Sequence, residues 1–341
     1  MKKQIRTFII ALLVIVGAFF IWKYIRDEHY PIPIQPSETW EPYLNSLDAQ
    51  RESIFVEAND GTLLEADLFI PNNGQERKPA VVFSPGSGDS LYQNYSHALV
   101  ETYILDLFLS RDFAVLLVNK RGMGQSEGNY VKNSIEGRAD DLYASVNFIQ
   151  DHPDIDPENV GVIGHSQGGW VVAQAAGEHP DIAFFISLAG PTVTMRVNSL
   201  DNQYHYALCQ GLEGKELEDE LARRQKRIDI SIAIGNLTNF GFFGFDARNM
   251  DYDPRDALLN VESPGLYAFA ENDVLVTPAL NIERLEEIFN GNIPAHLSTV
   301  VIDNATHGFR IVNDPCEVLD KQPISEELVE VLNNWLTEQG Y

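Results

Sequence analysis

Short apolar runs recur along most of this chain with helical patterns between them, and this alternation restricts the fold more than any other feature of the sequence. Runs of this kind, rich in β-branched residues, are typical of strands buried on both faces of a parallel sheet. Since connections between parallel strands cross over in a right-handed sense, we predict an α/β fold with a mostly parallel, doubly wound sheet. The predicted strands are Ala80–Phe83, Val115–Val118, Val160–Ile163, Phe184–Leu188, Leu266–Phe269 and Leu297–Ile302.

The two ends of the alternating region carry further signals. Ser53–Ala58 and Leu63–Ile70 are joined by Asn59-Asp60-Gly61-Thr62, and Asp-Gly between two apolar runs is a strong hairpin signal. Glu326–Leu336 has its apolar residues on one face, which predicts an amphipathic terminal helix. We therefore expect one domain over residues 51–341, with hairpin strands at its start.

Two internal segments are predicted to be helical. Apolar residues recur every three or four positions from Ile135 to Ile149, and Asn133 with Glu136 resembles a capping box at the start of this helix. The alternation then breaks between about residues 191 and 262, where Glu213–Arg227 is charge-rich and Asn236–Phe245 is rich in Gly and Phe. We interpret residues 191–262 as a mostly helical cap inserted into the domain.

The first residues are predicted to lie outside the fold. Lys2, Lys3 and Arg6 precede an uncharged run from Thr7 to Trp22. That run is short for a spanning helix of about 17–25 residues and long for a signal-peptide core of about 7–15 residues. We expect residues 1–28 to be an uncleaved membrane anchor, with a cleaved signal peptide and secretion as the alternative.

The charges around this segment predict the location of the rest of the chain. Basic residues before the helix favour a cytoplasmic N-terminus, so we expect the domain outside the cytoplasm, periplasmic or extracellular. Residues 29–50 contain Pro31, Pro33 and Pro36 and are expected to form a stiff stalk. A net charge of −26 with no clustered basic surface argues against a nucleic-acid partner.

The chain has two cysteines, Cys209 and Cys316. Neither lies in a Cys-x-x-Cys pair or beside a histidine, which argues against a zinc site. They would pair only in an oxidising compartment, and their separation along the chain gives no indication that they meet. We therefore expect them to be unpaired, with a disulfide as the alternative.

Gly164-His165-Ser166-Gln167-Gly168-Gly169 follows an apolar strand and precedes a helical run. This is the G-x-S-x-G pattern in the strand–turn–helix setting that it requires. The turn projects the serine hydroxyl above the sheet, and the helix N-terminus adds positive potential near a developing oxyanion. We predict that Ser166 is a nucleophile, and that His165 points elsewhere and serves packing.

A serine hydroxyl needs a base, and the base needs a carboxylate that orients it. His307 follows the strand Leu297–Ile302, and Asp273 follows the strand Leu266–Phe269. The order serine, acid, histidine fits this fold class. We predict His307 as the base and Asp273 as its acid. Glu271 and Asp303 are alternative acids, and an Asx turn is the alternative role for Asp273.

An oxyanion hole needs two donors directed to the place where negative charge develops. The backbone N–H of Gln167, directly after the nucleophile, is expected to be one donor. The second is expected from the loop Ser84–Asp89, which follows the first parallel strand. Within that loop we predict the N–H of Ser87, with Gly86 providing backbone freedom.

These motifs together resemble bacterial α/β-hydrolases of the esterase, serine aminopeptidase-like and dienelactone-hydrolase-like group. The resemblance runs from Ser53 to Phe309 and implies carboxylester hydrolysis through an acyl-enzyme, no cofactor, a small-molecule substrate and a variable cap that selects it. Two positions depart from the group: Pro85 stands where His is frequent, and Asn119-Lys120 where Asp is frequent. Both are expected to be peripheral to the catalytic residues. The matching segments are Asn59–Thr62, Pro85–Gly88, Lys120–Ser126, Gly164–Gly169, Glu271–Asp273 and Thr306–Phe309.

Alternative functions remain open at this point. A serine aminopeptidase would need cap carboxylates that bind a free amine, a thioesterase would act on thioesters, and a tethered binding protein would have kept the fold without chemistry. Aromatic residues of the cap line an acyl pocket or pack the cap onto the domain. The candidate carboxylates are Glu213, Glu216, Glu218, Asp219 and Glu220, and the aromatic residues are Phe240, Phe242, Phe243 and Phe245.

Overall fold

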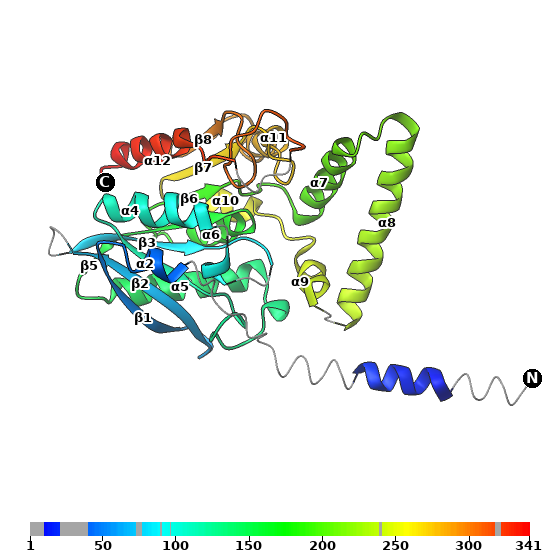
Figure 1. The fold of residues 1–341 in the computed structure, drawn as a ribbon, viewed down its shortest axis with the longest axis horizontal. Coiled ribbons are helices and arrows are strands. Elements are labelled where there is room, and N and C mark those ends of the chain that lie inside the picture. The colour runs from blue at the N-terminus through cyan, green and yellow to red at the C-terminus, as the bar shows by residue number, and fades with distance from the viewer. Residues whose placement is uncertain are drawn as a thin grey trace, which may run out of the picture.

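A computed structural model describes residues 10–20, 40–72, 77–88, 91–95, 97–238, 241–317 and 322–341. Its described strands form one sheet in the order β1-β2-β4-β3-β5-β6-β7-β8 (Figure 1). The six strands from β4 to β8 in that order are mutually parallel, and β1 and β2 form the predicted antiparallel hairpin. The predicted α/β fold is confirmed. The strands are β1 Ala49–Glu57, β2 Leu63–Pro71, β3 Lys78–Ser84, β4 Ala114–Val118, β5 Ile155–His165, β6 Phe185–Leu188, β7 Gly265–Ala270 and β8 Leu297–Ile302.

Helices cover both faces of the sheet, because successive strand residues point to opposite sides. Val82 belongs to one apolar cluster, which packs against α5, α6, α10 and α11. Its neighbour Val81 belongs to a second cluster, which packs against α2, α4 and α12. The helices are α2 Trp40–Leu44, α3 His97–Leu99, α4 Leu107–Ser110, α5 Ile135–Gln150, α6 Gln167–Glu178, α10 Arg255–Asn260, α11 Pro278–Ile288 and α12 Glu326–Glu338, with the 3₁₀ turns η1 Tyr92–Asn94 and η3 Tyr130–Lys132 and the π-helical segment η2 Val100–Asp106.

Helices α7 Met195–Cys209, α8 Gly214–Thr238 and α9 Gly241–Asn249 form the cap. They lie within residues 191–262 and rise beyond the carboxyl ends of the central strands (Figure 1). Contrary to our expectation, Cys209 and Cys316 form a disulfide, with Cα atoms 5.2 Å apart. The bridge ties the end of α7 to the segment that follows β8. The sequence did not predict this contact, because the two cysteines are 107 positions apart and meet only when the cap folds back over the sheet edge.

Several boundaries differ from those predicted. Trp40 of α2 is completely buried, so the packed domain begins within residues 29–50, the predicted stalk. The first turn of α5 is capped by Ser134, whose hydroxyl accepts the N–H of Gly137 at 3.0 Å. Asn133 therefore does not cap α5, and its side chain accepts the N–H of Ser134.

Only part of the predicted anchor lies within the described residues. Residues 10–20 are helical, and the remainder of residues 1–28 falls outside the described ranges. Across the portions of the chain that the structure describes, none of the helices has both the length and the apolar character needed to span a bilayer.

Candidate active site

Ser166 stands at the turn between β5 and α6, with φ 56° and ψ −123°. Its backbone N–H donates to Leu188 O on β6 at 2.9 Å, which fixes the turn to the sheet. The flanking glycines are required by close packing. A Cβ at Gly164 would lie 2.2 Å from Gly168 O, and one at Gly168 would lie 2.1 Å from Ser84 O. Glycines two positions before and after Ser166 therefore let the turn pack closely enough to hold the serine in this strained conformation.

His307 and Asp273 come from the loops after β8 and β7 and are in contact. His307 Nδ1 lies 2.7 Å from Asp273 Oδ2, and the Asp273 side chain is fully buried. The other carboxylate oxygen accepts the N–H groups of Leu275 at 2.7 Å and Val276 at 3.0 Å. A carboxylate can only accept, so Nδ1 carries the hydrogen and Nε2 is left with its lone pair.

The alternative acids have other partners. Glu271 accepts the backbone N–H of Asn304 at 2.7 Å, and the backbone N–H of Asp303 donates to Glu327. An Asx turn was the alternative role predicted for Asp273. The residue does form such a turn through Leu275 and Val276, and it binds His307 at the same time. Its two backbone hydrogen bonds hold the carboxylate in the orientation that meets the imidazole ring.

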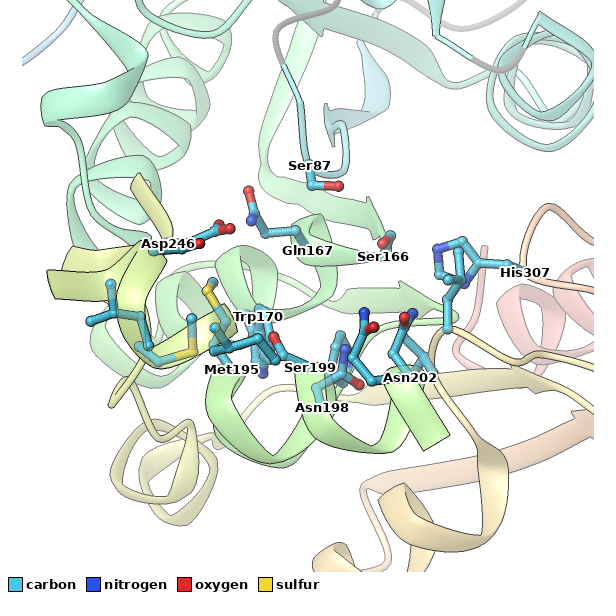
Figure 2. A pocket seen from close by; sticks show the side chains of 18 of the residues that line it. Ser87, Ser166, Gln167, Trp170, Met195, Asn198, Ser199, Asn202, Asp246 and His307 are labelled. Carbon is cyan, nitrogen blue, oxygen red and sulfur yellow. The ribbon is translucent and has the colours of Figure 1, made fainter. Parts of the chain in front are cut away.

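Ser166 and His307 face each other at one cavity, with Gln167 and Ser87 on the opposite side of Ser166 (Figure 2). Within the described residues no hydrogen bond joins the Ser166 hydroxyl to the His307 ring. Such contacts are frequently loose in sites that hold no substrate and shorten in the reacting complex.

His165 has a polar role that the packing prediction missed. Its Nε2 donates to the backbone oxygen of His307 at 2.7 Å, and its Nδ1 accepts the Tyr95 hydroxyl at 2.5 Å. Burial, together with the neighbouring His307, lowers the pKa of His165 to about 3, so the ring stays neutral and keeps this tautomer. Tyr95 in turn receives a backbone hydrogen bond from Gly86. A hydrogen-bonded chain thus links the loop after β3 to the loop that carries His307.

Two buried cations fix the loop after β3. Lys120 Nζ donates to Gly86 O at 2.9 Å and to Gly88 O, and Arg138 donates to Pro85 O at 2.6 Å. Loop carbonyls that point toward these cations point away from the cavity. Lys120, which was expected to be peripheral to the catalytic residues, reaches this loop from the end of β4 and acts on its backbone. A lysine close after a buried strand is the sequence signal that could have indicated this role.

Arg138 also orders the turn at Ser166. It donates to the side-chain oxygen of Gln167 at 2.5 Å, and the Tyr130 hydroxyl donates to the same oxygen at 3.0 Å. Ser87 and Gln167 both line the cavity beside Ser166. Their positions, with the Gln167 side chain held by Arg138 and Tyr130, are compatible with two backbone donors on one side of Ser166.

The cavity has a volume of about 560 Å³ and lies between the sheet edge and the cap. The predicted acidic cluster does not line it, and Glu220 binds Arg223, Arg224 and Arg227 of its own helix. Phe245 is buried and stacks on Tyr130 with centroids 4.5 Å apart, so it packs the cap onto the domain. The side chains of Phe240, Phe242 and Phe243 lie outside the described residues. The cap contributes Met195, Asn198, Ser199, Asn202, Gln203, Arg224, Arg227, Ile228, Ser231, Ile232, Asp246 and Met250 to the lining.

Comparison with known proteins finds hydrolases. Residues 60–227 match the X-Pro dipeptidyl-peptidase family (S15 family). The uncharacterized protein YfhR of Salmonella typhimurium is 29% identical over 129 residues, which are 38% of this chain and 41% of that protein. Thiohydrolase aneE of Aspergillus aculeatus is 30% identical over 118 residues, 34% of each chain. The matches therefore span less than half of these relatives.

Solved structures are similar over most of the chain. Esterase Pf2001 of Pyrococcus furiosus superposes with a TM-score of 0.60 at 17% identity, covering 92% of this chain and 97% of that chain. Est1E of Butyrivibrio proteoclasticus, solved with ferulic acid bound, gives 0.53 at 16% identity, covering 84% and 99%. Likeness at such identities shows the fold, which in these cases is that of α/β hydrolases.

Proposed function

We propose that this chain, which has the fold of α/β hydrolases, is a serine hydrolase that cleaves small or medium carboxylic esters through an acyl-enzyme. One observation carries this proposal. Ser166, at a strained strand-to-helix turn, faces His307 across a cavity, and the other ring nitrogen of His307 binds the buried Asp273 at 2.7 Å. The esterase neighbours support an ester substrate.

The chemistry follows from these positions. His307 Nε2 removes the proton of the Ser166 hydroxyl as its oxygen attacks the carbonyl carbon, and Asp273 stabilises the imidazolium that forms. The oxyanion is held by the backbone N–H groups of Ser87 and Gln167. His307 then protonates the leaving alcohol. Water, activated by the same ring, releases the acid and restores the serine.

Substitution of Ser166 by Ala tests the nucleophile. The variant should form no burst of p-nitrophenol with a p-nitrophenyl ester and should not be labelled by a fluorophosphonate probe, whereas the wild-type chain should do both. Circular dichroism provides the folding control. Turnover that survives in the variant would refute Ser166 as the nucleophile, and a wild-type chain inert to ester and probe alike would favour the binding-protein alternative.

A peptidase is the second candidate, and the match of residues 60–227 to the X-Pro dipeptidyl-peptidase family favours it. The same catalytic residues would cleave an amide, with a poorer leaving group. Thioester cleavage is the third candidate, supported by the likeness to a thiohydrolase. Rates on matched p-nitrophenyl esters, aminoacyl p-nitroanilides and thioesters separate the three. The proposal of an esterase requires the highest kcat/KM for the oxygen ester.

We also propose that residues 1–28 anchor the chain and that the domain works outside the cytoplasm. The Cys209–Cys316 disulfide supports this location, since disulfides persist in oxidising compartments and are rare in the cytosol. Fractionation of cells that express the full chain, followed by protease treatment of intact cells or spheroplasts, tests it. A chain found in the cytosolic fraction with both thiols reduced would contradict the proposed location.

A further inference from the structure

Asp246 is a carboxylate in the catalytic cavity that the proposed chemistry does not use. It lies on α9, and Figure 2 shows its side chain directed into the cavity, on the far side of Gln167 from Ser166. No hydrogen bond or ion pair reaches it from any residue within the described ranges. Burial raises the pKa of Asp246 to about 7, as expected for a carboxylate shielded from water without a cationic partner.

A second acceptor without a donor lines the same cavity. Asn198 Oδ1 on α7 is buried, and it has no hydrogen-bond partner among the residues that the structure describes. An unpaired buried acceptor destabilises the fold, and such groups in native proteins call for an explanation such as a ligand. Asp246 and Asn198 come from different cap helices, and both need a hydrogen-bond donor.

The cationic residues of the cavity already have partners. Arg224 and Arg227 on α8 both bind Glu220, at 2.8 and 2.9 Å. Arg224 also donates to Gln210 Oε1 at 2.6 Å. These contacts hold the Arg224 guanidinium between α8 and the end of α7 and tie Arg227 to its own helix. The charge that lacks a partner in the described cavity is therefore the negative charge of Asp246.

Besides Gln167, the lining between Ser166 and Asp246 includes an apolar surface. Trp170 of α6 is buried at the base of the cavity, and Met195 and Met250 lie beside it. Figure 2 shows Trp170 and Met195 on the Asp246 side of the cavity. A substrate that fills this space would place methylene groups against Trp170 and Met195. A hydrogen-bond donor at the end of its chain would then lie near Asp246.

We propose that the cavity selects acyl groups with an apolar stem and a terminal protonated amine, which binds Asp246. This proposal rests on the proposed function, because it places the acyl carbonyl at Ser166. It assigns the amine-binding role to Asp246 and not to the acidic cluster at the start of α8. The amine takes no part in bond breaking, so its effect is on recognition and positioning.

Three sets of p-nitrophenyl esters of matched length, ending in an ammonium, a methyl or a carboxylate group, test this with the full chain. The ammonium-ended ester of the best-fitting length should exceed its methyl-ended counterpart in kcat/KM by about 10- to 100-fold, the range of a charged hydrogen bond. In Asp246→Asn this ratio should fall to near one. Asp251→Asn is the matched control, because Asp251 pairs with Arg196 at the surface and does not line the cavity.

A binding measurement gives an answer that does not depend on turnover. A linear alkylammonium ion should inhibit hydrolysis of the methyl-ended ester competitively in the wild-type chain and at least tenfold less well in Asp246→Asn. Equal rates for the three end groups, or preference for the carboxylate end, would overturn the proposal, and the latter would assign recognition to Arg224 and Arg227. Hydrolysis of the methyl-ended ester reports on the proposed function alone, so the two failures are distinguishable.

Discussion

Replacing both Cys209 and Cys316 by Ser should destabilise the chain substantially. The bridge closes a loop with a sequence separation of 107 residues. By the chain-entropy relation, such a cross-link removes about 16 cal/mol/K from the unfolded ensemble, equivalent to about 4.8 kcal/mol at room temperature. Residual structure in the unfolded chain reduces this value, so we expect a loss of about 2–5 kcal/mol in the free energy of unfolding.

The same change should alter substrate binding. Cys209 ends α7, which carries Asn198 and Met195 into the cavity, and Cys316 follows the loop of His307. Without the bridge, α7 loses a covalent link to the segment that carries the base. We expect KM to rise by a larger factor than kcat falls, because the residues proposed for chemistry are held by the sheet and not by the cap.

Guanidinium unfolding at equilibrium, followed by tryptophan fluorescence, measures the stability. The wild-type chain in a strong reductant should match the double variant, whereas the double variant should not respond to reductant. Each single Cys→Ser variant should match the double variant, because either change removes the bridge. The reasoning would be refuted if the oxidised wild-type chain and the double variant had free energies of unfolding within about 0.5 kcal/mol of each other. Alkylation must show that the wild-type chain is oxidised in this comparison.

Three further predictions concern the site. Asp273→Asn should lower kcat by about 10³- to 10⁴-fold on a p-nitrophenyl ester with the fold intact, because an amide favours the wrong imidazole tautomer; unchanged kcat would exclude Asp273 as the acid. Lys120→Met should lower kcat by about 10²-fold with little change in KM, since the oxyanion loop loses its buried donor, and an equal change in both constants would indicate mere loosening of the pocket. The preference for the ammonium-ended ester should decline as pH falls through about 7, where Asp246 takes up a proton. The methyl-ended ester, measured in parallel, cancels the effects of pH that are common to both substrates.

The fold and the positions of three site residues were predictable because each depends on local signals. Alternating apolar runs define parallel strands, and the carboxyl ends of parallel strands meet at one edge of the sheet. Ser166, Asp273 and His307 each follow such a strand. Their convergence therefore required no knowledge of side-chain packing, only the chain order and the place where each strand ends.

The surrounding residues were not predictable in the same way, because their partners are distant in the sequence. Lys120 meets the loop after β3 across 34 and 32 positions, and His165 meets His307 across 142. Each of these side chains is buried, and its partner is a backbone oxygen, which has no residue-specific signature. Sequence patterns indicate the periodicity of strands and helices, whereas contacts of this kind depend on how the loops pack against one another in the folded chain.

The site therefore combines two parts with different physical origins. The first is a buried polar layer, in which Arg138, Lys120 and His165 hold the backbone around Ser166 and His307 with charged or neutral donors. Loss of any of these donors leaves buried carbonyl groups unpaired, so this layer tolerates little change. The second part is the cap, which packs onto the domain through side chains such as Phe245, stacked on Tyr130 of η3. Substitutions at Asp246 alter the end group that the cavity receives without disturbing a hydrogen bond of the first layer. Selectivity in this chain should accordingly change through the cap while the rate of the chemical step stays fixed by the sheet edge.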